Sequence, residues 1–227
     1  TALLEFKMVK VPEEVNSTIQ RIDRVLRRVK GGVTPGADTA AVAEAETGQD
    51  TTVEEGGVAE ETAISVDELF GDSPIADTDT AADSTVVVDQ QTFEEKPFSA
   101  LMRNIRGEIG VPKQNKAAVD RILQMPEVQD VVPTDAEFLW SASTEVIPTQ
   151  SGNQEFYILY LLNREAGLTG GVVTDAQATL GGAGSQTAGQ PVVYLDMNAA
   201  GSRQWGRLTG ANVGRRVAIV LDDCIHM

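Results

Sequence analysis

The sequence predicts a mixed α+β protein with an antiparallel or mixed sheet, interrupted by a long acidic insert. Two observations support this expectation: the order of the hydrophobic patterns and the distribution of charge. The patterns run strand, helix, polar insert, strand, helix, several strands, and then strand, helix, strand, which is not the regular alternation of a doubly wound sheet. At 227 residues, the chain is long enough for one large domain or two small ones.

The acidic insert, residues 31–96, holds the net charge. The chain has 34 acidic and 18 basic residues and a net charge of −16. The insert contains 17 of the acidic residues and one basic residue, Lys96, so the remainder is neutral. Rich in Ala, Thr, Asp, Glu, Gly and Ser, the insert cannot bury enough apolar surface to offset its ordering entropy. We expect it to be largely disordered, with a helical turn at 65–71 and a short edge strand at 85–89.

The first elements are a strand and a helix. Residues 1–9 alternate apolar and charged side chains, which is typical of a half-buried strand. The helix begins at Pro12, and its first turn has two glutamates, which favour the helix dipole. Its apolar side chains repeat at helical spacing, and basic residues crowd its C-terminal half before Gly31-Gly32 ends it.

After Pro97 the composition is that of a globular protein, with two further helices among the strands. The expected helices are 116–125, capped by Asn115, and 199–213, capped by Asn198. Strands are expected at 98–105, 136–142, 155–163, 191–198 and 216–223, with a short strand or turn at 128–132 and a glycine turn plus strand within 168–180. Strands 136–142 and 155–163 are expected to form a hairpin.

The sequence offers no convergent set of catalytic groups, so we expect no enzyme. His226 is the only histidine and lies next to the end of the sequence, so a Ser-His-Asp or Cys-His site would have no other histidine to use as its base. Asp222, Asp223, Cys224 and His226 are potential metal ligands, but structural sites usually draw ligands from separated segments. We interpret these four residues as the end of a strand, and we expect no metal and no cofactor.

Five aromatic residues gather on two of the expected strands: Phe138, Trp140, Phe156, Tyr157 and Tyr160. Apolar strand positions usually belong to the core. The alternative is a groove for extended polypeptide, because exposed strand edges and aromatic pockets bind such chains. These residues are therefore the candidate polypeptide-contact residues.

A series of short motifs spans residues 168–222. The motifs are Leu168-Thr169-Gly170, Thr174-Asp175-Ala176, Ala200-Gly201 with the aromatic Trp205, Asn212-Val213-Gly214, and the run Ala218-Ile219-Val220-Leu221-Asp222. This series resembles the first large periplasmic domain of SecD and fused SecDF, membrane subunits of the bacterial protein-export translocon. Residues 1–6 resemble the strand that the family carries before its inserted head.

The resemblance implies a domain organisation. An incomplete ferredoxin-like base would comprise residues 1–30 and 190–227, and a β-rich head would comprise 97–189. Because the family begins earlier and continues further, we expect the chain to be a piece of a longer protein. Structural roles are implied for Leu168, Thr169, Gly170, Thr174, Asp175, Ala200, Gly201, Asn212, Gly214 and Asp222.

The resemblance also implies a function in protein export. This part of the family lies on the periplasmic side of the inner membrane, between flanking spans, and assists export driven by the proton-motive force. Its implied partners are unfolded preprotein, the Sec translocon channel and a SecF-type subunit or fused half. Nucleic acid is not expected, since phosphate selects for Lys and Arg. The alternative is a structural domain whose acidic insert recruits a partner protein without touching substrate.

Overall fold

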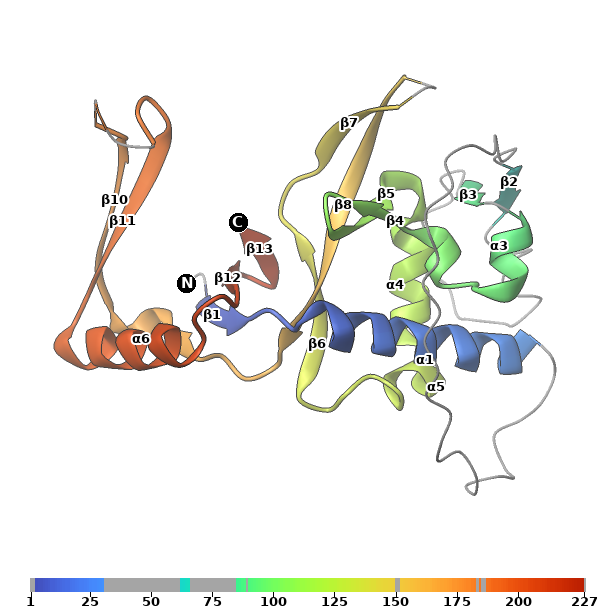
Figure 1. Ribbon diagram of the computed structural model, residues 1–227, viewed down its shortest axis with the longest axis horizontal. Coiled ribbons are helices and arrows are strands. Elements are labelled where there is room, and N and C mark those ends of the chain that lie inside the picture. The colour runs from blue at the N-terminus through green and yellow to red at the C-terminus, as the bar shows by residue number, and fades with distance from the viewer. Residues whose placement is uncertain are drawn as a thin grey trace. The chain divides into compact units, whose positions relative to one another are not determined.

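The computed structural model describes residues 3–30, 62–65, 85–88, 90–149, 152–182, 184 and 187–226. The protein is mixed α+β, as predicted, and divides into two compact units. The first unit comprises Thr1–Ser17, Asn104–Gly110 and Val132–Met227, and the second comprises Thr18–Arg103 and Val111–Val131. Their elements are labelled in Figure 1.

Most of the first unit is one sheet, with nine strands among the described residues. The order is β4-β5-β8-β6-β13-β12-β1-β9, and β7 pairs with β8 beside β6. The strands are β1 (Leu4–Met8), β4 (Arg103–Ile105), β5 (Glu108–Pro112), β6 (Ala136–Ser141), β7 (Glu145–Thr149), β8 (Gly152–Asn163), β9 (Leu168–Thr169), β12 (Val217–Leu221) and β13 (Cys224–His226). The predicted antiparallel pairing of β6 with β8 is confirmed, but the two strands do not form a simple hairpin, because β7 occupies the expected loop and itself pairs with β8.

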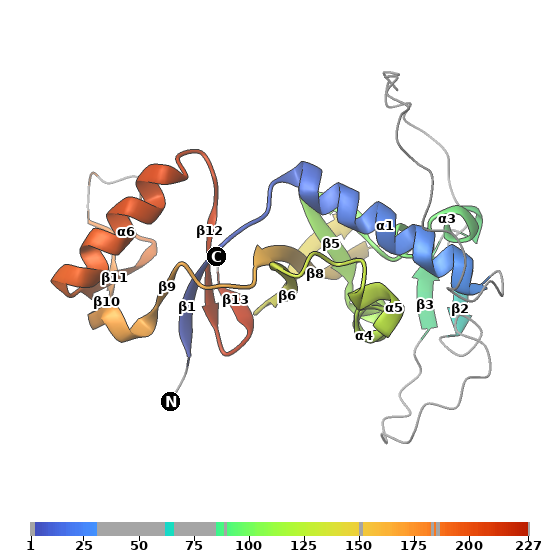
Figure 2. The same cartoon turned by 90° about the horizontal axis from the view of Figure 1, so that it is seen from below.

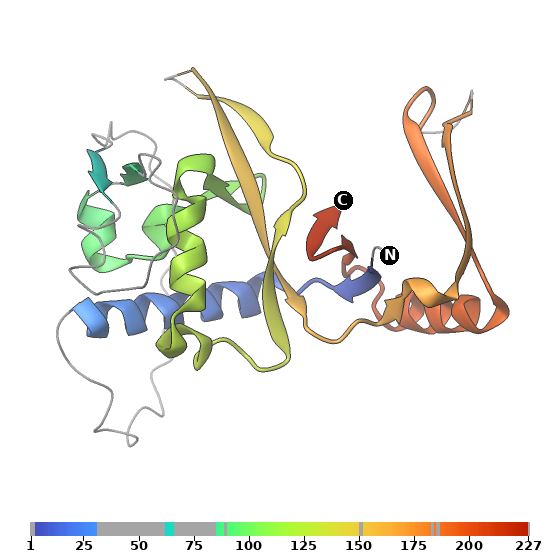
Figure 3. The same cartoon turned by 180° about the vertical axis from the view of Figure 1, so that it is seen from behind.

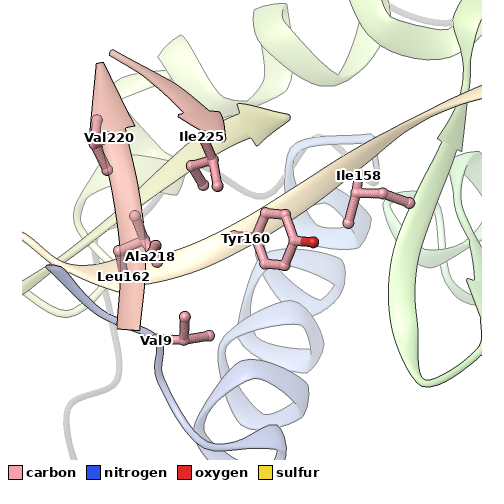
Figure 4. Close-up of a cluster of buried hydrophobic side chains, with 7 residues drawn as sticks. All are labelled: Val9, Ile158, Tyr160, Leu162, Ala218, Val220 and Ile225. Atoms are coloured by element: carbon pink, nitrogen blue, oxygen red, sulfur yellow. The ribbon is translucent and has the colours of Figure 1, made fainter. Parts of the chain in front are cut away.

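The sheet curls until the end of β1 reaches β8. Val9 forms a bridge with Leu162, and the amide of Lys10 donates to the carbonyl of Leu161 at 2.9 Å. Strands β8, β6, β13, β12 and β1 therefore surround a common interior. Figure 4 shows the buried side chains that fill it, which are Val9, Ile158, Tyr160, Leu162, Ala218, Val220 and Ile225.

A separate two-stranded ribbon belongs to the same unit. It consists of β10 (Val173–Leu180) and β11 (Pro191–Met197), which pair antiparallel. Helix α6 (Ala199–Ala211) follows at the root of the ribbon (Figure 3), preceded by the predicted N-cap, Asn198. The Asn198 side-chain oxygen accepts a hydrogen bond from the Gly201 amide at 2.8 Å, so this cap is confirmed.

The second unit is built mainly of helices. Helix α1 (Pro12–Lys30), continuous in Figure 2, has the predicted bounds, and its residues from Thr18 onward belong to this unit. The others are α3 (Gln90–Glu95), α4 (Lys116–Gln124) and α5 (Pro126–Gln129), with 3-10 turns at Ser99–Leu101 and Lys113–Asn115. Strands β2 (Thr62–Ser65) and β3 (Thr85–Val88) pair antiparallel, which confirms the strand expected at 85–89. The helical turn expected at 65–71 lies, apart from Ser65, outside the described residues.

Three local expectations were wrong or only partly right. The segment 98–105 opens with a 3-10 turn, and only Arg103–Ile105 is a strand. The segment 128–132, expected as a short strand or turn, begins inside α5 and continues as a turn at 130–131, because Pro126 sits at a helix start and fixes φ there. Asn115 makes no side-chain cap bond to α4. Its buried amide donates to the carbonyl of Leu101 at 3.0 Å instead.

Candidate functional site

The five candidate aromatic residues do not form a single cluster. Phe156 and Tyr160 are buried, and Tyr160 belongs to the interior of the curled sheet. Phe138, Trp140 and Tyr157 are half-buried. Side chains alternate between the two faces of a strand, so Phe156 and Tyr160, four residues apart, share one face of β8, and Tyr157 lies on the other. The sequence already contained this signal.

Three of the aromatic residues share one face of the sheet. Trp140 pairs with Leu159 and Phe138 pairs with Leu161 across the β6–β8 ladder, and Tyr157 is two residues from Leu159. The rings of Trp140 and Tyr157 meet edge to face, with centroids 6.1 Å apart. We call Phe138, Trp140 and Tyr157 the aromatic face. It offers a large apolar contact area held by neighbouring strands.

Tyr160 lies next to a charged pair, Arg216 and Glu108. The Arg216 guanidinium lies 5.8 Å from the centre of its ring and pairs with both carboxylate oxygens of Glu108. Burial raises the pKa of Tyr160, and the negative charge of Glu108 raises it further, while Arg216 opposes both. This arrangement fixes Tyr160 as a packing residue with a polar tip.

Lys7 is a buried cation between two carboxylates. Its ammonium group lies 2.9 Å from Glu5 and 2.6 Å from Glu137. Burial alone lowers the pKa of Lys7, but the hydrogen bonds to Glu137 and Glu5 outweigh it, so the pKa is raised. Nearby, Lys10 contacts Asp135 at 2.5 Å, and this hydrogen bond lowers the pKa of the Asp135 carboxyl. Both pairs join β1 and its end to the segment around β6.

The first motif residues lie where β9 leads into the ribbon. Leu168 is buried. It and Thr169 form β9, which pairs antiparallel with β1. A Cβ atom on Gly170 would lie 2.9 Å from the Cβ of Leu4, so a side chain does not fit there. Thr174 donates from its hydroxyl to the carbonyl of Asp196 at 3.1 Å, and Asp175 accepts a hydrogen bond from Gln177 at 2.8 Å.

The later motif residues shape α6 and the turn that follows it. Ala200 is in the first turn of α6, and a Cβ on Gly201 would lie 2.6 Å from the Cβ of Val172. The side-chain amide of Asn212 donates to the last-turn carbonyl of Leu208 at 2.8 Å, and Gly214 has a φ of +83°. The close approach at Gly201, the Asn212 hydrogen bond at the helix end and the positive φ of Gly214 give these three residue types a physical reason.

The C-terminal run is a tight hairpin and not one strand. Asp222 and Asp223, with φ values of 48° and 62°, form the turn between β12 and β13, so the expectation of a strand over 216–223 was too long. The Asp222 carboxylate accepts a hydrogen bond from the Leu3 amide at 2.8 Å. The described part of the chain contains no group of three His, Cys, Asp or Glu side chains placed to hold a metal ion.

The ribbon has an apolar side that the sequence analysis missed. The pairing of β10 with β11 places apolar side chains opposite each other on one side of the ribbon: Ala176 with Leu195, Ala178 with Val193, and Leu180 with Pro191. We call these six residues the apolar ribbon face. Five are exposed and Leu195 is half-buried; Leu180 is 67% exposed and Val193 62% exposed. Only knowledge of the register reveals this face.

Known proteins similar to this chain are subunits of the protein translocase. Residues 144–226 match the family model described as SecDF, P1 head subdomain. The protein translocase subunit SecD of Rhodothermus marinus is 34% identical over 172 residues, which is 73% of this chain and 26% of that protein. The SecD of Elusimicrobium minutum is 33% identical over 97 residues, or 43% of this chain and 18% of the relative.

A third relative agrees with these two. The SecD of Anaeromyxobacter dehalogenans is 38% identical over 71 residues, or 31% of this chain and 12% of the relative. No solved structure matches the chain. The chain spans about a quarter of the length of the Rhodothermus relative. Over the residues that match, the chain belongs to the SecD and SecDF family, as part of the first periplasmic domain.

Proposed function

We propose that this chain is the extracytoplasmic domain of a protein-translocase accessory subunit and that it contacts unfolded preprotein as it leaves the membrane. The observation that supports this proposal is the aromatic face. Trp140 and Tyr157 are packed edge to face, which holds their rings in place while both stay partly accessible. Aromatic rings bury a large area against many different side chains, which suits a substrate class of diverse sequences.

A strand edge lies beside the aromatic residues along β8. Strand β7 pairs with β8 and with no other described strand. An open edge offers main-chain donors and acceptors that an extended chain can use whatever its sequence. The aromatic face and this edge together would hold a segment weakly enough to release it.

The aromatic face is tested by site-specific photocrosslinking in the complete translocon with a stalled preprotein. We expect crosslinks from probes at Trp140 and Tyr157. Val213, which is 86% exposed beyond α6, is the control position. Equal yields at all three positions would contradict contact through the aromatic face.

The role in the complete protein is also proposed. We infer that the domain performs no catalysis, that it lies on the periplasmic side of the inner membrane, and that it works with the Sec channel and a SecF-type partner in export driven by the proton-motive force. Relatedness to SecD supports this. In the described part of the chain, no helix has the length and hydropathy to cross a membrane.

The division into base and head stays a prediction. We propose an incomplete ferredoxin-like base at 1–30 and 190–227 and a head at 97–189. The matched head range, 144–226, crosses the expected boundary between residues 189 and 190. The paired strands β1 and β12, from the two ends of the chain, support a base assembled from both ends.

A second candidate function is recruitment of a partner protein by the acidic insert, favoured by its isolated charge. It is tested by replacing the eight acidic residues of 31–61 with Asn or Gln. If preprotein contact is the main role, export should change by less than about twofold, because the aromatic face is untouched. A large loss of export by a folded variant would favour recruitment.

A further inference from the structure

The β10–β11 ribbon lacks the usual protection of exposed strand edges. Each of its strands pairs only with the other among the described strands. Its two charged residues, Asp175 and Asp196, lie opposite each other at the end of the ribbon next to α6. The pairing of β10 with β11 shifts register beside them, between Val173 and Asp175. Natural edges are guarded by charges, prolines or bulges. From Ala176 to Leu180, β10 has none of these.

The open edge of β10 borders the apolar ribbon face. Five of the six side chains of this face are exposed, and Figures 1 and 3 show the ribbon rising from α6 without another helix or strand of its unit beside it. The other side is mixed, with one valine among mainly polar residues: Asp175, Gln177, Thr179, Val192, Tyr194 and Asp196. An isolated two-stranded ribbon is marginally stable in water, so a third strand paired along β10, with apolar side chains beside those of the apolar ribbon face, would stabilise it.

We infer that β10 accepts an extended, apolar-rich segment of preprotein as a third strand, with alternate side chains of the segment on the apolar ribbon face. This inference rests on the proposed function for the nature of the substrate. Main-chain hydrogen bonds are indifferent to sequence, which matches a substrate class of many sequences. Strand β10 has no proline, whereas β11 begins with Pro191, which lacks an N–H group.

A second copy of the chain fits this face less well. Stable interfaces between proteins use about 20–30 residues on each side, and the apolar ribbon face has six. A short peptide strand needs only one edge and one side of a ribbon. Polypeptide in extended conformation is therefore the occupant that the geometry favours.

The inference is tested by fluorescence anisotropy with the full chain. The probe is a labelled peptide of about ten residues, alternating valine and threonine between terminal lysines. Val193→Lys places a charge on the apolar ribbon face and is expected to weaken binding at least about tenfold. Tyr194→Lys is the matched control, because Tyr194 is 60% exposed on the opposite side of the same strand. It is expected to change binding less than about twofold.

Two further measurements separate strand addition from a general effect of added charge. Leu180→Lys, at the far end of the face, should repeat the effect of Val193→Lys. A peptide N-methylated at alternate residues should bind at least about tenfold more weakly, because it cannot form the main-chain ladder. Equal losses for Val193→Lys and Tyr194→Lys, or full binding of the methylated peptide, would overturn the inference. A change of oligomeric state in Val193→Lys would assign the face to a second copy instead.

Crosslinking and peptide binding together distinguish a failure of this inference from a failure of the proposed function. In the translocon, normal crosslinks from Trp140 and Tyr157 with unaltered peptide binding by Val193→Lys would leave the proposed function standing and remove the ribbon site. The loss of crosslinks from the aromatic face, with peptide binding still sensitive to Val193→Lys, would keep the ribbon site and remove the aromatic contact.

Discussion

Asp23 is a buried carboxylate that accepts hydrogen bonds from main-chain amides at the start of the 3-10 turn Ser99–Leu101. It accepts hydrogen bonds from the amides of Phe98 and Ser99, at 2.7 Å and 3.1 Å, and from the Ser99 hydroxyl at 2.5 Å. These contacts join α1 to a segment 75 residues away. An Asp among the mainly apolar residues of a buried helix face gives no sign of its partner, so the sequence could not predict this link.

We expect Asp23→Ala to lower the free energy of unfolding by about 2–4 kcal/mol, because a charge-assisted set of bonds is lost and buried donors stay unpaired. Urea unfolding measures the change. Asp130→Ala is a control at an exposed helix end. If both variants unfold at the same urea concentration, the Asp23 contacts contribute nothing to stability.

Lys7 gives a pH dependence with a defined sign. Its pKa is raised in the folded protein because its bonds to Glu137 and Glu5 outweigh the effect of burial. The stabilisation is fully present below the unfolded pKa of about 10.4 and is lost as pH rises through the folded pKa. The stability difference between wild type and Lys7→Met should therefore shrink above about pH 10.

Near pH 8, Lys7→Met should cost about 3 kcal/mol, because Glu5 and Glu137 lose their shared cation. Lys10→Met is the matched control. Its partner Asp135 is exposed, so solvent replaces the lost contact and the effect should be smaller. If the difference in unfolding free energy between wild type and Lys7→Met stays constant from about pH 8 to about pH 12, the positive charge of Lys7 does not stabilise the fold.

Among the elements, helix α6 contains an internal comparison of glycines. A Cβ on Gly201 would lie 2.6 Å from the Cβ and 2.8 Å from a methyl group of Val172, while a Cβ on Gly206 would meet no atom within 4 Å. Gly201→Ala should therefore destabilise the root of the ribbon by about 1–3 kcal/mol. Gly206→Ala should stabilise the helix by up to about 1 kcal/mol.

Thermal unfolding of the two glycine variants measures both effects. The opposite signs are the essential result, because helix propensity alone would make both substitutions stabilising. If Gly201→Ala also stabilises the protein, the close packing of α6 against Val172 is not as described.

Elements with strong local signals were predictable, and those set by distant contacts were not. Helix α1 has a proline start, a helical apolar period and a glycine end, and its bounds are as expected. The cap at Asn198 is equally local. By contrast, Asn115 has the sequence position of a cap, but burial gives its amide another partner, Leu101. The aromatic face was partly predictable from alternation, whereas the apolar ribbon face required the register.

At the scale of the whole molecule, the closure of the curled sheet depends on a few contacts at the end of β1. Val9 forms the bridge with Leu162, and the Lys10 amide donates to the carbonyl of Leu161 at 2.9 Å, while the Val9 amide continues the β1–β12 ladder by donating to the carbonyl of Arg216 at 3.0 Å. Nothing in the hydrophobic pattern around Lys10 predicts this, because the partner strand is about 150 residues away. Fold class was therefore predictable, and the closure was not.

Hydrogen exchange tests whether this closure is part of the cooperative core. We expect the amides of Val9 and Lys10 to exchange with an opening free energy within about 1 kcal/mol of global unfolding. The Gly107 amide, which bonds to Asn104 in an exposed turn, should exchange by local opening. Similar rates for Lys10 and Gly107 would show that the sheet closes only loosely.

The pairing of β1 with β12 also fixes how the domain bears force. Leu4 lies opposite Leu221, and the amide and carbonyl of Leu3 bond to the side chain and amide of Asp222 just beyond. A pull that separates Leu3 from Asp222 loads these bonds first and then each rung in turn, because ladder bonds lie across the strands. The pair therefore unzips under low tension, whereas a pull along the strands would load every rung together in shear.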